Sequence, residues 1–165
     1  MEANGPWWRE LNKYHWYVLV VCALGWLFDT MDQQLFVLAR GPSVEDVLGL
    51  TRYERDEQGV IKRDANGVPS KVKLTDEESR RREAFGGYAT AIFLIGWATG
   101  GLLFGMFGDR WGRARTMMVT ILMYSVFTGL SAISVAWWDY ALYRFLTGMG
   151  VGGEFAAGVA LVAEV

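Results

Sequence analysis

The stretch GMFGDRWGRAR (residues 105–115) lies between two segments that carry no charged side chain, residues 85–107 and residues 116–138. A helix needs about 20 mostly apolar residues to cross the hydrocarbon core of a bilayer. Both segments are long enough for this, and the charges between them are confined to a few residues. The stretch therefore predicts a short polar turn that joins two membrane-spanning helices.

Two further windows, residues 16–39 and residues 140–163, are also apolar enough to span. Of the 34 charged residues, 19 lie between Gly41 and Glu83, which leaves the rest of the chain unusually apolar. The first window is too aromatic for a secretory leader and has no small-residue cleavage pattern, so we expect it to be retained. We predict an all-α fold, a polytopic membrane helix bundle with four transmembrane helices.

Local signals set the expected boundaries. Arg40-Gly41-Pro42 predicts the end of the first helix, because glycine favours the position after a helix and proline cannot continue it. Thr75 and Glu78 form a capping-box pattern that predicts a helix start, and Asn66-Gly67 resembles a hairpin turn between residues 60–62 and 71–73. The predicted organisation is an N-terminal segment (1–15), a span (16–39), a polar loop (40–84), a span (85–107), a short loop (108–115), and two spans (116–138 and 140–163).

Three motifs resemble those of the major facilitator superfamily. The stretch 105–115 is similar to the signature loop G-x-x-x-D-R-x-G-R-[RK], and it departs from the pattern at Ala114. RFLTGMGVGGE (residues 144–154) resembles the fourth-helix motif R-x-x-x-G-x-G-x-G. FDTMD (residues 28–32) is similar to the F-D-G-[YF]-D first helix of the sugar-porter, aromatic-acid and metabolite symporter branches, with Thr30 in place of the glycine.

The resemblance implies four spans of the six-span N-terminal half of a twelve-span transporter. It implies a cytoplasmic signature loop, a cytoplasmic N-terminal segment, and an extracytoplasmic loop at residues 40–84. The nine Lys and Arg residues between Gly41 and Glu83 favour the opposite orientation by the positive-inside rule. The implied function is secondary transport of a small polar organic solute, a sugar or an organic acid, across the cell membrane by alternating access and coupled to protons.

The implied partners are membrane lipid, the solute, protons and a C-terminal half that the 165 residues do not contain. Because the chain stops after the fourth apolar window, the alternative is a truncated membrane module or scaffold that does not transport.

Two carboxylates, Asp29 and Asp32, lie inside the first apolar window. A charge at such a depth is costly and normally faces a cavity or a partner. Arg144 lies at a similar distance from the same end of the fourth window, so we predict an ion pair between Asp32 and Arg144. The resemblance implies a proton-coupling role for this pair, with which we group Asp29, and the alternative is a permanent salt bridge that fixes the helix register.

Other polar groups lie near the predicted pair. Gln33, Gln34 and Glu154 are candidates for a solute cavity, with Asp29 and Glu154 deep enough to share it. The alternative for the two glutamines is that they only satisfy neighbouring helices.

The signature loop and Glu164 predict a charge cluster that latches helix ends in one conformation, and the alternative is a positive-inside anchor. Its predicted residues are Gly105, Asp109, Arg110, Gly112, Arg113 and Glu164.

Small residues recur at spacings of four on two of the predicted spans, which permits close approach of helix backbones in lipid. Our main interpretation is helix packing. The predicted packing residues are Gly96, Gly100, Gly101, Gly148, Gly150 and Gly152.

Several classes of function are disfavoured. The sequence shows no nucleophile with an adjacent base, no phosphate-binding loop and no cluster of metal ligands, so we predict neither an enzyme nor a bound cofactor or metal. Cys22 is the single cysteine, which excludes an internal disulfide. No basic tract suggests nucleic-acid binding.

Overall fold

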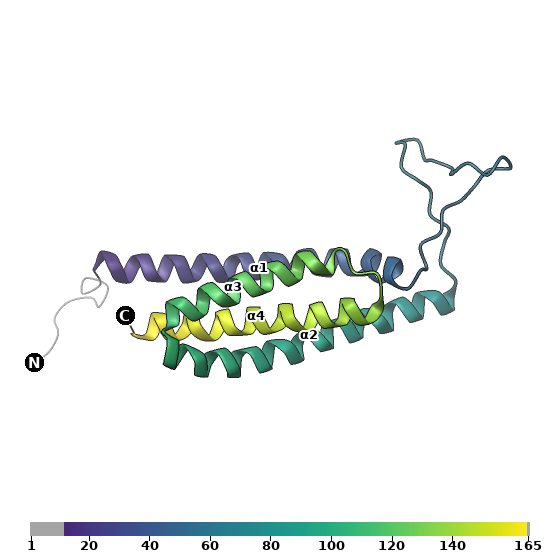
Figure 1. The fold of residues 1–165 in the computed structure, drawn as a ribbon. Coiled ribbons are helices and arrows are strands. Elements are labelled where there is room, and N and C mark those ends of the chain that lie inside the picture. Colours follow the sequence, from purple (N-terminus) through teal and green to yellow (C-terminus); the bar gives the residue numbers. More distant parts are fainter. Residues whose placement is uncertain (1–11, 165) are drawn as a thin grey trace, which may run out of the picture.

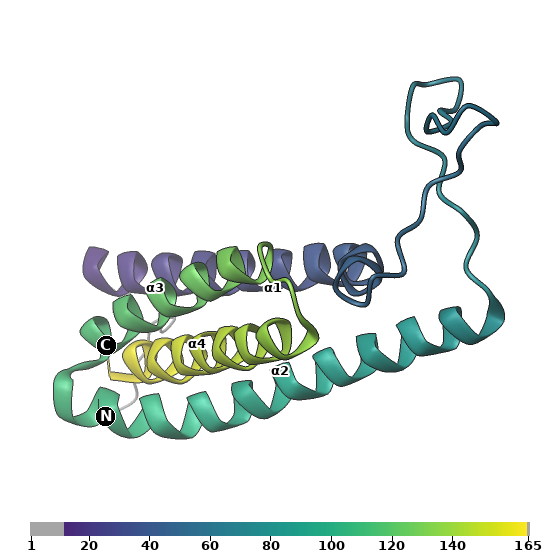
Figure 2. The same ribbon diagram turned by 45° about the vertical axis from the view of Figure 1, so that its right-hand side comes forward.

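A computed structural model describes residues 12–164, except for the side chains of Asp29 and Asp32. It contains four helices, α1 (Lys13–Val47), α2 (Asp76–Trp111), α3 (Arg113–Ser131) and α4 (Trp137–Glu164), which form one bundle (Figures 1 and 2). No named strand occurs in the described part of the chain, and the predicted all-α class is confirmed. Most of the predicted N-terminal segment, residues 1–11, lies outside the described residues.

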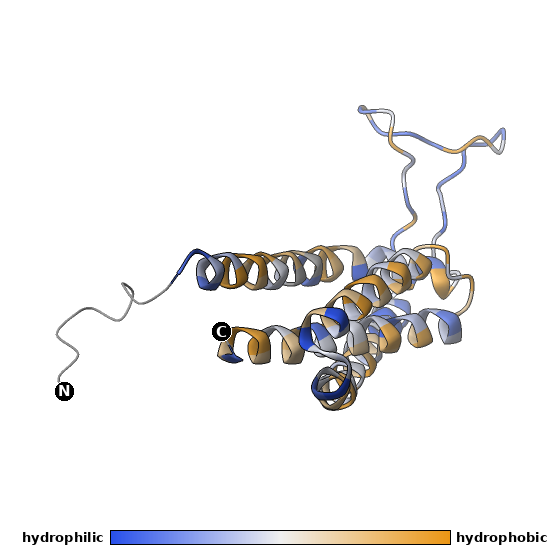
Figure 3. Ribbon diagram, turned by 60° about the vertical axis from the view of Figure 1, so that its left-hand side comes forward, coloured by the Kyte–Doolittle hydropathy of each residue, from blue (hydrophilic) through white to orange (hydrophobic). Residues whose placement is uncertain are grey.

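The helix ends gather at two poles of the bundle. The start of α1, the α2–α3 junction and the end of α4 lie at one pole, and the polar loop projects from the other (Figure 1). Hydrophilic residues lie mainly at the helix ends and along this loop (Figure 3). By length and composition, α2 and α4 are each able to cross a membrane. Spans over α1 and α3 stay predictions.

Side-chain caps fix two of the helix starts. The Asn12 side chain accepts hydrogen bonds from the backbone N–H groups of Tyr14 (2.8 Å) and His15 (3.1 Å) at the start of α1. At the start of α2, the Thr75 hydroxyl accepts from the backbone N–H of Glu78 (3.3 Å), and the Glu78 carboxylate accepts from the backbone N–H of Thr75 (2.9 Å). The predicted capping box is therefore confirmed.

The predicted end of the first helix at Arg40-Gly41-Pro42 is wrong, because α1 continues to Val47 with Pro42 inside it. A proline within a helix costs about 3 kcal/mol. The continuation buries Val44 completely against Ala89 and Tyr140. It also places the Glu45 carboxylate 2.8 Å from Arg82. These tertiary contacts offset the local penalty and shorten the polar loop to residues 48–75.

The third helix ends earlier than expected. We predicted a span over residues 116–138, whereas α3 ends at Ser131, and residues 137–138 already belong to α4. The Ser131 and Ser134 hydroxyls donate to the carbonyls of Thr128 and Ser131, respectively, in the turn. Serine side chains compete in this way with helical hydrogen bonding. The turn itself is apolar, so hydropathy could not reveal it.

The polar loop folds back on itself through a ring of three backbone hydrogen bonds. The N–H of Glu54 donates to the carbonyl of Ser70 (2.9 Å), that of Ser70 to Lys62 (2.9 Å), and that of Lys62 to Glu54 (2.8 Å). The N–H of Val72 donates to the carbonyl of Arg52 (2.8 Å) and holds the two ends of this ring together.

Two turns of similar sequence, RDEQGV (residues 55–60) and RDANGV (residues 63–68), form two corners of this ring. The second is the predicted turn at Asn66-Gly67, and in it Gly67 has a φ of +79°. The predicted flanking pairing is wrong, since residue 61 pairs with Arg55 and residue 71 with Tyr53. Three mutually pairing segments replace the simple hairpin.

Candidate functional site

The contact between α2 and α4, called here the glycine seam, brings two helix backbones together. A Cβ atom at Gly96 would overlap the carbonyl of Phe145, and one at Gly100 would overlap the backbone of Met149. From the other side, a Cβ at Gly148 or at Gly152 would overlap backbone atoms of α2. Only glycine permits this approach, so the seam is a close backbone contact.

The other predicted packing glycines lie differently. Gly101 has more room, because a Cβ there would lie 3.5 Å from the carbonyl oxygen of Gly152. Gly150 faces α3, where a Cβ would lie 2.7 Å from the Cβ of Tyr124. At Gly153, which we did not predict, an added Cβ would lie 2.6 Å from side-chain atoms of both Phe104 and Thr120. Gly150 of α4 therefore faces α3, whereas Gly153 lies where α2 and α3 both approach α4.

Arg144 lies on α4 and is 5% exposed. Its Nη2 donates to the Ser131 hydroxyl (2.9 Å), and its guanidinium carbon lies 4.2 Å from the centre of the Phe36 ring and 5.7 Å from that of Tyr140. Phe36 belongs to α1, so the guanidinium bridges two helices. Cation–π contacts of this kind are stronger when the cation is desolvated.

The structure does not describe the side chains of Asp29 and Asp32. The ion pair between Asp32 and Arg144 therefore stays a prediction. The backbone of α1 nevertheless sets their register. Asp32 precedes Phe36 by four residues and therefore shares its helix face. Asp29 lies one further turn along the same face.

A cavity of about 400 Å³ lies between α1, α2 and α4, and it receives the side chains of Thr30 and Gln33. Its other walls are mainly aromatic and aliphatic, and they include Trp26, Trp97 and Phe155. The second predicted glutamine, Gln34, is exposed and is not among the lining residues. Of the two glutamines, Gln33 is therefore the one placed to contact a ligand in this cavity.

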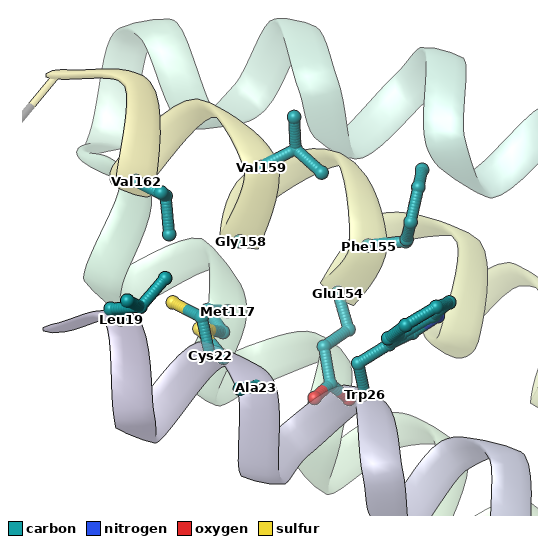
Figure 4. A pocket seen from close by; sticks show the side chains of 10 residues that line it. All are labelled: Leu19, Cys22, Ala23, Trp26, Met117, Glu154, Phe155, Gly158, Val159 and Val162. Atoms are coloured by element: carbon teal, nitrogen blue, oxygen red, sulfur yellow. The ribbon is translucent and has the colours of Figure 1, made fainter.

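Glu154 lines a second cavity, also about 400 Å³, between α1, α3 and α4. The carboxylate points from α4 toward α1, beside Ala23 and Trp26 (Figure 4). The residue is 4% exposed, and its Oε2 has no hydrogen-bond partner among the described residues. Trp26 and Phe155 line both cavities and so stand between them.

The signature loop and the end of α4 meet at the pole that holds the α2–α3 junction. Arg113 Nε donates to Glu164 Oε1 (3.0 Å), Nη2 pairs with Asp109, and Nη1 donates to the carbonyl of Gly105 (3.3 Å). The hydrogen bond to Glu164 and the nearby carboxylates raise the pKa of the Arg113 guanidinium. Gly112 has a φ of +93°, which a residue with a side chain rarely adopts, and this conformation separates α2 from α3.

Arg110 is exposed. The latch role of these residues stays a prediction.

Sequence reasoning did not identify several residues around these groups. Phe36 and Ser131 contact the Arg144 guanidinium, and Trp26 and Phe155 line both cavities. The spacing of Phe36 from Asp32 was a usable signal for the first. The others depend on how helices cross, which no local pattern records. Within the described residues, no group of three or more His, Cys, Asp or Glu side chains could hold a metal ion.

Comparison with known proteins gives consistent relatives. The family model described as "Sugar (and other) transporter" matches residues 62–165. A Haemophilus influenzae protein named for metabolite transport is 35% identical over 94% of this chain and 30% of its own length. The niacin transporter NiaP of Acinetobacter baylyi is 28% identical over 93% of this chain and 28% of its own length.

A third relative matches over a shorter stretch. The sialic acid transporter NanX of Escherichia coli is 46% identical over 34% of this chain and 14% of its own length. No solved structure matches the chain. The chain spans about 30% of the length of the Haemophilus influenzae and Acinetobacter baylyi relatives.

These relatives are named as transporters, which are membrane proteins, and not as enzymes. Their match agrees with the signature loop and the glycine seam. The chain therefore belongs to the sugar (and other) transporter family of the major facilitator superfamily.

Proposed function

We propose that residues 1–165 form the first four spans of a secondary transporter that moves a small polar organic solute by alternating access. In this proposal the signature loop faces the cytoplasm, and the polar loop at residues 48–75 lies on the opposite side of the membrane. A C-terminal half completes the transport path, because midplane sites in such proteins form between repeats. The solute would enter the space between α1 and α4, where one cavity receives Thr30 and Gln33 and the adjoining cavity is lined by Glu154.

We propose further that Asp32 and Arg144 couple transport to protons. The observation that carries this proposal is the position of the Arg144 guanidinium, buried on the Phe36 ring one helical turn from Asp32. An arginine close to a carboxylate favours the charged form, and burial without the arginine favours the protonated form. Separation and approach of the pair during the transport cycle would therefore release and bind a proton.

The test compares two modes of transport in the complete gene product that contains residues 1–165, reconstituted in vesicles. Replacing Asp32 by Asn removes the titrating group but keeps the size of the side chain. We expect Asp32→Asn to abolish proton-driven accumulation of solute and to retain exchange of solute across the membrane. Asp139→Asn, at an exposed position near the start of α4, is the matched control and should leave both modes intact.

Accumulation by Asp32→Asn at the wild-type level would refute proton coupling through this pair. Loss of both accumulation and exchange would point to the alternative, in which the pair only fixes the helix register. Arg144→Lys keeps the charge but loses the planar guanidinium on Phe36, so we expect it to reduce accumulation as well.

A further inference from the structure

The cavity beside Glu154, called here the Glu154 pocket, contains a buried carboxylate in apolar surroundings. Apart from Glu154 and Cys22, every residue that lines it is apolar. Glu154 Oε1 lies against α1 at Gly25, where a Cβ atom would come within 2.6 Å of it. Its Oε2 is buried and has no hydrogen-bond partner among the described residues.

A carboxylate in this environment needs either a proton or a counter-cation. Removing an ionised carboxylate from water is expensive unless a cation or a proton accompanies it. Among the described residues that line the pocket there is no Lys, Arg or His, so these walls do not supply the cation. The Trp26 ring stands beside the carboxylate, whereas Phe155 lines the same pocket with its ring pointing away from it (Figure 4). Ring faces of this kind attract cations.

The size and exposure of the pocket suit a small molecule. Its volume is about 400 Å³, within the usual range for ligand sites. Trp26 is 64% exposed and Phe155 is 44% exposed, so both aromatic walls lie at the surface of the four-helix bundle. The near absence of other polar groups disfavours a sugar, because its hydroxyls would be buried unsatisfied. The charge of Glu154 disfavours an organic acid.

We infer that the Glu154 pocket binds a small organic cation, an ammonium or a protonated nitrogen heterocycle with an apolar body. An N–H of the cation donates to Glu154 Oε2, and the apolar body lies against Trp26 and Phe155. This inference names a solute class for the proposed transport function and rests on it only for the step of translocation. Binding itself is tested without transport.

The first experiment uses Cys22, which lines the pocket and is the single cysteine of the chain. The purified full chain in detergent is treated with a cationic reagent, methanethiosulfonate ethylammonium, and an anionic one, methanethiosulfonate ethylsulfonate. Each rate is divided by the rate of the same reagent with 2-mercaptoethanol. We expect about a tenfold preference for the cationic reagent at Cys22, because a buried charge acts through a low dielectric.

Substitution separates the pocket charge from the charge of the protein as a whole. Glu154→Gln should bring the two normalised rates to equality. Glu83→Gln removes a carboxylate from an exposed position on α2 and should leave the preference unchanged. Equal rates in the wild-type protein, or a preference that survives Glu154→Gln, would overturn the inference.

The second experiment measures protection of Cys22 by three probes of similar shape, and its main comparison needs no variant. Benzylammonium should slow the modification, whereas benzyl alcohol and benzoate should not. Equal protection by benzylammonium and benzyl alcohol would overturn the inference and would show a merely apolar pocket. Selective protection together with no transport activity of the complete gene product would retain the binding site and refute the proposed function.

Discussion

The helix α4 contacts α2 and α1 in opposite ways. Against α2, glycines of both helices lie on the backbone of the partner, and no side chain separates them at Gly100 or Gly152. Against α1, larger side chains leave two cavities of about 400 Å³ each. The buried charged groups Arg144 and Glu154 also face α1 rather than α2.

This difference shows how one helix combines rigidity with adaptability. Close backbone contact leaves few alternative arrangements, so α2 and α4 should move as one body. Cavities and a buried ionisable group require space and permit rearrangement. In the proposed transport cycle, the glycine seam preserves the pair α2–α4, while the interface with α1 changes.

The largest effect is expected from a substitution that breaks the glycine seam. Gly100→Ala places a Cβ into the backbone of Met149, where no side chain can move aside. We expect the free energy of unfolding to fall by about 1–3 kcal/mol. Unfolding of the purified chain by denaturant in detergent micelles measures this change.

Gly87→Ala is the matched control, because nothing lies within 4 Å of a Cβ at that position of α2. We expect Gly87→Ala to leave the free energy of unfolding unchanged or to raise it by about 0.5–1 kcal/mol. Equal destabilisation by the two substitutions would show that the seam is not a close backbone contact.

A glycine-to-alanine substitution on α1 should lower the free energy of unfolding by a smaller amount. A Cβ at Gly25 meets the end of the Glu154 side chain, which can rotate, rather than backbone. We therefore expect Gly25→Ala to lower the free energy of unfolding by less than about 1 kcal/mol. The double substitution Gly25→Ala with Glu154→Ala should remove this cost, which a double-mutant cycle measures. A loss as large as that of Gly100→Ala would contradict the contrast between the two interfaces.

A smaller effect is expected at the pole where α4 ends. Arg113→Gln removes the ion pairs with Asp109 and Glu164, which lie in reach of solvent. We expect a modest fall in melting temperature that shrinks as salt is raised, because salt screens exposed charges. Arg115→Gln, an exposed position two residues further on, controls for net charge. A salt-independent loss would indicate packing rather than charge as the cause.

The smallest effect concerns the start of α2. The backbone N–H and the hydroxyl of Thr75 lower the pKa of the Glu78 carboxyl below its usual value of 4.5. The ionised carboxylate therefore stabilises the helix start above pH 4.5, and this contribution disappears as the pH falls through the lower pKa of the folded state. The protection factor for amide hydrogen exchange, which corrects for the fall of the intrinsic exchange rate with pH, should decrease at residues 76–79 in that window.

Residues 96–100, in the glycine seam, should keep their protection over the same pH range. Glu78→Gln should remove the pH dependence at residues 76–79. If both segments lose protection together, the start of α2 and the seam unfold as one unit.

Sequence patterns predicted much of this architecture. Hydropathy and the signature loop identified a helical membrane protein of this superfamily, and the rows of glycines anticipated close packing. The sequence also indicates that Gly150 faces a different neighbour from Gly148 and Gly152, since residues two apart on a helix do not share a face. The capping box at Thr75 was local and could be read directly.

The predictions that failed concern features that depend on how distant parts of the chain pack together. The extension of α1 past Pro42 depends on the burial of Val44 against Ala89 and Tyr140, which are distant in sequence. The end of α3 lies inside a continuous apolar run, where composition does not distinguish a helix from a turn. The walls of the Glu154 pocket depend on how α1 crosses α4, and no spacing within one helix determines that crossing.

The ring of hydrogen bonds in the polar loop has a consequence for how this protein tolerates change. Because the chain enters at Arg52 and leaves at Val72 side by side, the intervening residues act as a cassette that does not set the distance between α1 and α2. We expect that such a cassette can be shortened, or exchanged for a reporter tag, without displacing the helices that it connects, as long as the pairing of Arg52 with Val72 is kept. The loop is thus the natural grafting point of the molecule.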